Sequence, residues 1–90
     1  MEYSILMTVY KKDKPEYFKK SIISMLNQSV LTNDFVIVKD GPITVQLQEI
    51  INYFSEQYPG LIRQVSIEKN IGLGLALNEG LKVCKNDIVA

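Results

Sequence analysis

Three short stretches of this 90-residue chain carry polar side chains and glycines that could bind a small ligand. Each stretch lies at the end of a predicted strand or just after it. In an open parallel sheet, ligands bind beyond the carboxyl ends of the strands, near the point where the strand order reverses. We therefore expect one crevice to be lined by Thr8 to Tyr10, Lys39 to Pro42 and Asn70 to Gly74.

Asp40 is the acidic residue best placed for binding, because it follows the apolar run Phe35 to Val38 and Lys39. A carboxylate at this position can point into the crevice and accept hydrogen bonds from a base or a ribose. An Asp-Gly pair is equally typical of a simple turn. The local sequence leaves both interpretations open.

The stretch Asn70 to Gly74 opens a predicted helix, whose free backbone N–H groups favour an anion such as a diphosphate. The alternative is a capped helix whose glycines serve packing. The stretch is not a dinucleotide fingerprint, because Leu77 stands where GxGxxG needs its last glycine and a third strand precedes it. A Walker loop is also excluded, since the chain contains no GK[ST].

The charge balance argues against a nucleic-acid partner. Ten Lys and Arg residues match ten Asp and Glu residues, so the basic excess that neutralises phosphates is missing. The lysines between residues 11 and 20 are interrupted by Asp13 and Glu16 and are predicted to form a solvated face. Four scattered acids lack the spacing of a paired acid and base and are predicted to be surface charges: Asp13, Glu16, Asp34 and Asp87.

Cysteine and histidine usage excludes further classes of site. Cys84 is the one cysteine and histidine is absent, so an intramolecular disulfide, a Cys-His dyad and a His/Cys zinc site cannot form. Cys84 is predicted to be a buried helix residue. No apolar run approaches the ~20 residues of a membrane span, and we expect a soluble, cytoplasmic chain without a transmembrane segment.

Strands and helices are predicted to alternate along the chain. Pro15 is a good first-turn residue, and Thr44 can cap the second helix. The third helix is predicted to start at Asn70 as its N-cap, with leucines on one side and small residues on the other. The predicted strands are Tyr3 to Tyr10, Phe35 to Val38, Leu61 to Glu68 and a fourth from Asp87 to Ala90; the helices run from Pro15 to about Asn27–Ser29, from Thr44 to Pro59, and from Asn70 onward.

This order, βαβαβαβ, predicts an α/β fold with a Rossmann-like open parallel sheet and helices on its faces. Residues 1–90 are predicted to form one domain, because no repeat, low-complexity segment or linker marks a second one. A chain that ends inside a strand also leads us to expect that more sequence follows Ala90.

Three motifs, in order, resemble family 2 glycosyltransferases, the inverting enzymes of the GT-A fold. The first strand ends in Met7-Thr8-Val9-Tyr10 and the following helix closes with Leu26-Asn27-Gln28-Ser29. The second strand and its turn read VIVKDGP, similar to the apolar strand of the family that ends in Asp-Asp-Gly-Ser. The third motif runs from Asn70-Ile71-Gly72-Leu73 to Ala76-Leu77-Asn78-Glu79-Gly80-Leu81.

The resemblance covers essentially the whole chain, which would be the nucleotide-binding part of such an enzyme. It implies a UDP-sugar donor. It implies that Thr8, Val9 and Tyr10 contact the uracil and ribose and that Asp40 accepts a hydrogen bond from the base N3–H. Asn70 and Gly72 would lie beside the nucleotide. The acceptor would be a saccharide or a lipid-linked saccharide. The resemblance implies a cytoplasmic enzyme, which would lie at the inner face of the membrane if its acceptor is lipid-linked.

The chain departs from the family pattern at its second motif. Where many members carry two acids, it has Lys39-Asp40, and Pro42 replaces a frequent serine. This version resembles galactosyl- or rhamnosyltransferases that build bacterial exopolysaccharide or lipopolysaccharide. The metal-binding Asp-x-Asp and the general base of the family would come after the strand that starts at Asp87. We therefore expect Mn²⁺ or Mg²⁺ and catalysis in the full enzyme, with no metal ligands, no catalytic residues and no activity in residues 1–90.

Two other interpretations stay open. A non-catalytic α/β interaction module would use an exposed sheet edge and apolar surface for a partner chain or for self-association. A nucleotidyltransferase fits less well. Such an enzyme would be expected to carry a Gly-rich loop directly after the first strand, and Tyr10 to Asp13 contains no glycine.

Overall fold

The computed structural model describes residues 2–27, 32–87 and 89. Within these residues, parallel strands alternate with helices, and the strands form one sheet in the order β1-β2-β3. The predicted α/β class and open parallel sheet are confirmed. The elements are β1 (Ser4–Val9), α1 (Pro15–Leu26), β2 (Asp34–Asp40), α2 (Val45–Gln57), β3 (Ile62–Ile67) and α3 (Leu73–Leu81).

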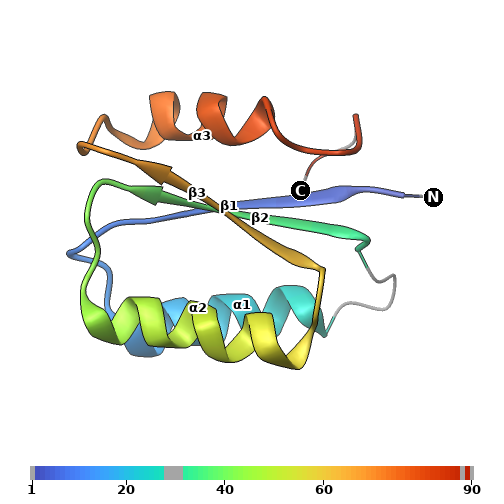
Figure 1. Cartoon of the computed structure of the whole chain (residues 1–90), viewed down its shortest axis with the longest axis horizontal. Coiled ribbons are helices and arrows are strands. Elements are labelled where there is room, and N and C mark those ends of the chain that lie inside the picture. Colours follow the sequence, from blue (N-terminus) through green and yellow to red (C-terminus); the bar gives the residue numbers. More distant parts are fainter. Residues whose placement is uncertain (1, 28–31, 88, 90) are drawn as a thin grey trace.

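The sheet lies between two layers of helix. Helices α1 and α2 cover one face and α3 covers the other (Figure 1). Because successive side chains of a strand point to opposite faces, β2 fills both interfaces. Its Phe35 and Ile37 belong to the core under α1 and α2, whereas Val36 and Val38 pack with Ala76 of α3. The fully apolar run of β2 is therefore the centre of the fold.

Local signals place the first two helices as predicted. Pro15 is the first residue of α1, and Phe18, Ile22 and Leu26 are buried on one stripe. The helix ends at Leu26; Gln28 and Ser29 of the predicted helix end lie outside the described residues. Thr44 caps α2, its hydroxyl oxygen accepting a hydrogen bond from the backbone N–H of Leu47 at 3.2 Å.

Helix α3 starts later than predicted. Asn70 is not its N-cap; Gly72 is, with φ at +92°, and the helix begins at Leu73. The predicted small side of the helix packs on the sheet, where Ala76 and Gly80 are buried. The leucine side faces outward, since Leu73 is 63% exposed.

The two glycines within α3 are expected to respond to alanine in opposite ways. A Cβ at Gly80 would lie 2.3 Å from Leu6 Cδ1 and 2.7 Å from Val38 Cγ2, whereas at Gly74 it would meet nothing within 4 Å. We expect Gly80→Ala to destabilise the fold by about 2 kcal/mol through overpacking. Gly74→Ala should instead stabilise it by ~0.5–1 kcal/mol through helix propensity. Urea denaturation of both variants checks this, and two shifts of the same sign would contradict it.

The chain returns to β1 after α3. Val89 forms an isolated parallel bridge with Ser4, on the edge of β1 that β2 does not occupy. Ile88 and Ala90 of the predicted fourth strand lie outside the described residues. The strand order therefore reverses at β1, and a ligand crevice is expected at its carboxyl end. None of the described helices combines the length and apolar composition needed to cross a membrane.

Candidate functional site

The loops that follow β1, β2 and β3 lie together at one end of the sheet (Figure 1). They enclose a cavity of about 460 Å³, a volume in the range of small-molecule sites. All six residues that the sequence predicts for a binding site are on its wall, together with Asp13 and Leu73. The lining residues are Thr8, Val9, Tyr10, Asp13, Asp40, Asn70, Gly72 and Leu73.

Asp40 ties the end of β2 to the loop before α3. Its Oδ1 accepts a hydrogen bond from the backbone N–H of Ile71 at 2.8 Å, and its Oδ2 accepts one from Gly72 at 3.1 Å. Only 5% of the residue is exposed. The carboxylate of Asp40 therefore holds the loop immediately before α3, and the N-cap position predicted for Asn70 is occupied by Gly72.

Gly41 allows this contact by letting two backbone segments touch. Its φ is +83°, and a Cβ there would lie 2.8 Å from the backbone nitrogen of Asn70. The Asn70 side chain donates to the carbonyl oxygen of Asp40 at 3.4 Å. The turn after β2 and the loop before α3 therefore form one unit, which supports the predicted placement of Asn70 and Gly72 beside the cavity.

Asp13 is a lining residue that the sequence interpretation treated as a surface charge. Its side chain accepts a hydrogen bond from the backbone N–H of Tyr10, and its own N–H donates to the Tyr10 carbonyl, both at 3.0 Å. Asp13 is half-buried rather than fully exposed. The turn-forming spacing of Tyr10 and Asp13 is the signal that could have found it.

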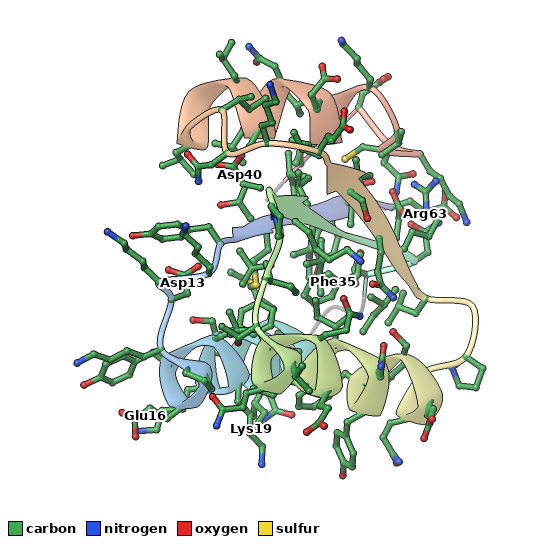
Figure 2. The ribbon with its side chains drawn as sticks, turned by 60° about the vertical axis from the view of Figure 1, so that its left-hand side comes forward. Asp13, Glu16, Lys19, Phe35, Asp40 and Arg63 are labelled. Carbon is green, nitrogen blue, oxygen red and sulfur yellow. The ribbon has the colours of Figure 1, made fainter. Side chains whose placement is uncertain are left out.

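The cavity carries negative charge. Asp13 and Asp40 both line it, and no Lys or Arg is among its described lining residues. Figure 2 shows both carboxylates at one end of the sheet, whereas Arg63 lies on the other side of the view. Carboxylates without a cation favour a ligand that presents hydroxyl and N–H donors.

The described residues do not fit a divalent metal ion. Asp13 and Asp40 are the two carboxylates among the described lining residues of the cavity, and the backbone hydrogen bonds that they accept fix their positions. Within residues 2–27, 32–87 and 89, no group of three or more His, Cys, Asp or Glu could hold an ion. Mg²⁺ takes octahedral oxygen coordination, which this donor set does not offer. We assign no step to the metal that the family resemblance implies.

Comparison with known proteins agrees with the motifs. The sequence profile described as glycosyl transferase family 2 matches residues 4–90. The chain belongs to this family. It is 36% identical over 88 residues to the amylovoran biosynthesis glycosyltransferase AmsE of Erwinia amylovora, covering 98% of the chain and 32% of that protein.

Two further relatives have similar coverage. A UDP-Gal:alpha-D-GlcNAc-diphosphoundecaprenol beta-1,3-galactosyltransferase of Escherichia coli is 34% identical over 88 residues, covering 98% of the chain and 31% of that enzyme. A glycosyltransferase of Haemophilus influenzae is 35% identical over 89 residues, covering 99% of the chain and 33% of that protein. The family 2 chain spans about a third of the length of these relatives.

The family 2 chain has a second polar cluster at the amino ends of its strands, centred on Asp34. The prediction of Asp34 as a surface charge is wrong, because its side chain is fully buried. Its Oδ1 accepts from two nitrogens of Arg63, at 2.8 and 3.0 Å. Its Oδ2 accepts from the Ser4 hydroxyl at 2.7 Å and from the backbone N–H of Lys85 at 2.8 Å. The carboxylate therefore joins all three strands to the segment after α3.

This cluster sets the ionisation of its members. Burial opposes the charged form of Asp34, but the Lys85 N–H, the Ser4 hydroxyl and the Arg63 guanidinium together lower its pKa below the ordinary value. Burial and the negative charge of Asp34 raise the pKa of the Cys84 thiol. Cys84 is not a buried helix residue as predicted: α3 ends at Leu81, and the half-buried thiol donates to the Gly80 carbonyl at 3.4 Å.

Proposed function

We propose that this chain is the nucleotide-sugar-binding part of a glycosyltransferase that uses a UDP-sugar donor. The observation that carries the proposal is the single cavity lined by all six residues that the motifs single out. Its position at the reversal of the strand order suits a nucleotide. UDP as the carrier is supported by the Escherichia coli relative, whose name specifies UDP-Gal.

In this proposal the whole enzyme transfers a sugar with inversion to a saccharide or lipid-linked acceptor during the synthesis of a surface polysaccharide. The support is the naming of two relatives, one for amylovoran biosynthesis and one for a diphosphoundecaprenol-linked acceptor. The residues described here contribute donor binding. The metal and the general base of the reaction are not assigned to them.

The uridine would lie across the ends of β1 and β2. Thr8, Val9 and Tyr10 would contact the uracil and ribose from one side, and Asn70 and Gly72 from the other. A carboxylate has about four acceptor positions, and the Ile71 and Gly72 N–H groups occupy two of those on Asp40. A further lone pair of Asp40 can therefore accept the N3–H of uracil without releasing the loop.

A titration of UDP into isotope-labelled chain tests this function. We expect backbone amide shifts at Thr8 to Tyr10, at Asp40 and Gly41, and at Asn70 to Gly72. Asp40→Asn should weaken UDP binding about tenfold, because the amide replaces an acceptor of a charge-assisted hydrogen bond with a donor.

The control for this titration is Glu56→Gln, which alters an exposed acid on α2, away from the cavity. Glu56→Gln should leave the UDP affinity unchanged. Shifts elsewhere on the chain, or equal affinity of the Asp40→Asn variant, would contradict the proposed site. GDP in place of UDP measures the preference for uracil.

A further inference from the structure

The positive charge of the chain is concentrated between Tyr10 and Lys20. These residues include five of the ten basic residues and two of the ten acidic ones, which leaves five basic and eight acidic residues for the rest. The net charge is therefore +3 in this segment and −3 elsewhere, although the whole chain is neutral. Figure 2 shows Asp13 and Glu16 of the segment on the side of the molecule opposite Arg63. Charge asymmetry of this kind indicates an electrostatic partner.

The turn after β1 holds the acid of the loop inward and leaves its lysines outside. Asp13 is half-buried, and its carboxylate accepts a hydrogen bond from the backbone N–H of Tyr10 at 3.0 Å. Lys11, Lys12 and Lys14 are exposed, as predicted for a solvated face. In the described part of the chain, none of these three lysines forms an ion pair with an acid. The loop therefore presents its ammonium groups to a partner without a competing carboxylate beside them.

An exposed aromatic ring lies among the lysines. Tyr17 is 58% exposed, and the ammonium groups of Lys14 and Lys20 lie 5.5 and 5.9 Å from the centre of its ring. Both distances are in the cation–π range. Tyr10, at the other end of the loop, is also exposed. Tyrosine is enriched where proteins meet the membrane–water interface, and clustered lysines bind anionic headgroups.

We propose that the exposed side of this segment, the lysine-tyrosine patch, docks on an anionic lipid bilayer. The ammonium groups would lie among the lipid phosphates, and the two rings would enter the headgroup region. Lys19 does not belong to the patch, because it lines the groove between α1 and α2 together with Glu49. The patch consists of Tyr10, Lys11, Lys12, Lys14, Tyr17 and Lys20.

A bilayer fits the patch better than a nucleic acid does. Two ammonium groups already lie over the Tyr17 ring and compete with a base that would stack on it. A planar surface contacts the patch alone, whereas the net charge of −3 on the other residues repels a polyanion that wraps around the chain.

This inference goes beyond the proposed function and does not require it. Lys14, Tyr17 and Lys20 are not among the lining residues of the first cavity described above, the one that Asp40 lines. The patch and that cavity meet at Tyr10, which belongs to both. Docking would therefore hold the nucleotide cavity close to the bilayer.

Sedimentation of the chain with lipid vesicles tests the inference. At low ionic strength, the wild type should bind vesicles of equal parts phosphatidylglycerol and phosphatidylcholine, and it should not bind vesicles of phosphatidylcholine alone. Lys14→Gln/Lys20→Gln should bind the anionic vesicles about thirtyfold more weakly, because each lysine at such a surface contributes about fivefold. Added salt should weaken wild-type binding. The fold of this variant should be retained, since the Lys14 side chain makes no capping hydrogen bond.

Matched control variants come from other parts of the molecule. Lys82→Gln/Lys85→Gln removes the same charge from the residues after α3 and should leave vesicle binding unchanged. Tyr17→Ser should weaken vesicle binding about fivefold, because the ring buries apolar area in the headgroup region. Tyr58→Ser, at the end of α2, should not weaken it. Circular dichroism of each variant checks that the fold is intact.

Equal binding of anionic vesicles by wild type and the Lys14/Lys20 variant would overturn the inference, as would equal binding of anionic and neutral vesicles. An equal loss for the Lys82/Lys85 variant would also overturn it, because total charge would then decide. A single-stranded oligonucleotide that binds the wild type as tightly as the vesicles do would assign the patch to a nucleic acid instead. A chain that binds anionic vesicles but not UDP would overturn the proposed function and support this inference.

Discussion

Asp34→Asn is expected to lower the free energy of unfolding by about 3 kcal/mol, because it breaks a buried, multiply hydrogen-bonded ion pair. The amide keeps one acceptor oxygen but turns an NH₂ group toward donors. These donors are the hydroxyl of Ser4, the N–H of Lys85 and the guanidinium of Arg63. A 90-residue domain has only about 5–10 kcal/mol in total, so much of the stability of this chain depends on one carboxylate.

The pH dependence of the wild type should report the same group. The Asp34 pKa is lower in the folded chain than in the unfolded one, so the unfolded chain binds the proton more tightly. The stabilisation by Asp34 is therefore complete above the unfolded pKa of about 3.9 and is lost as the pH falls through the lower, folded value. We expect the wild type to lose stability below about pH 5 more steeply than Asp34→Asn.

Urea denaturation followed by circular dichroism measures both effects. Glu79→Gln is the matched control, because it also removes an acid from an ion pair, here the exposed pair with Lys82. Exposed pairs contribute ~0–1 kcal/mol, so this variant should remain close to wild type. Similar losses for the Asp34 and Glu79 variants, or parallel pH profiles for wild type and Asp34→Asn, would show that the buried cluster does not carry this stability.

Gly41→Ala is expected to destabilise the fold by about 3 kcal/mol and to abolish nucleotide binding at the first cavity. Two costs add at this position. The residue has φ at +83°, which costs a non-glycine residue about 1–2 kcal/mol. Its Cβ would also press on the backbone of Asn70 at 2.8 Å, which cannot move without displacing the loop that Asp40 holds.

Gly60→Ala separates the two costs. Gly60 has nearly the same φ, +79°, but a Cβ there meets nothing within 4 Å. This variant should lose only about 1 kcal/mol and should bind UDP as the wild type does. Thermal denaturation and the UDP titration on both variants measure the difference. Equal destabilisation by the two substitutions would mean that the backbone contact at Gly41 has no energetic weight.

The alternation of strands and helices was predictable from local signals alone. Pro15 and Thr44 mark helix starts that the structure confirms, and the apolar run of β2 is buried on both faces as its composition indicates. The start of α3 was not predictable in this way. The loop before it is held by Asp40, which is 31 residues distant from Ile71 along the chain, so no local pattern contains the information.

The polar clusters of the structure were likewise predictable only in part. Its six predicted residues come together because parallel strands bring their carboxyl ends to one edge. Asp34 was misjudged because acids without paired spacing were assigned to the surface, whereas its partner Arg63 lies 29 residues away along the chain. Cys84 was misjudged because the apolar pattern of α3 gives no sign that the chain must turn after Leu81 to reach Asp34.

The hydrogen bonds from Asn86 to Ser4 span 82 residues and have a consequence for the order of folding. Asn86 is synthesised 82 residues after Ser4, so the Ser4 hydroxyl accepts these bonds only after that whole stretch has been made. The β1-α1-β2 unit can form earlier from nearer contacts. A nascent chain should therefore hold a sheet whose Asp34 carboxylate lacks the Lys85 donor, and the resistance of this sheet to proteolysis should rise when residues 85 and 86 dock beside Ser4.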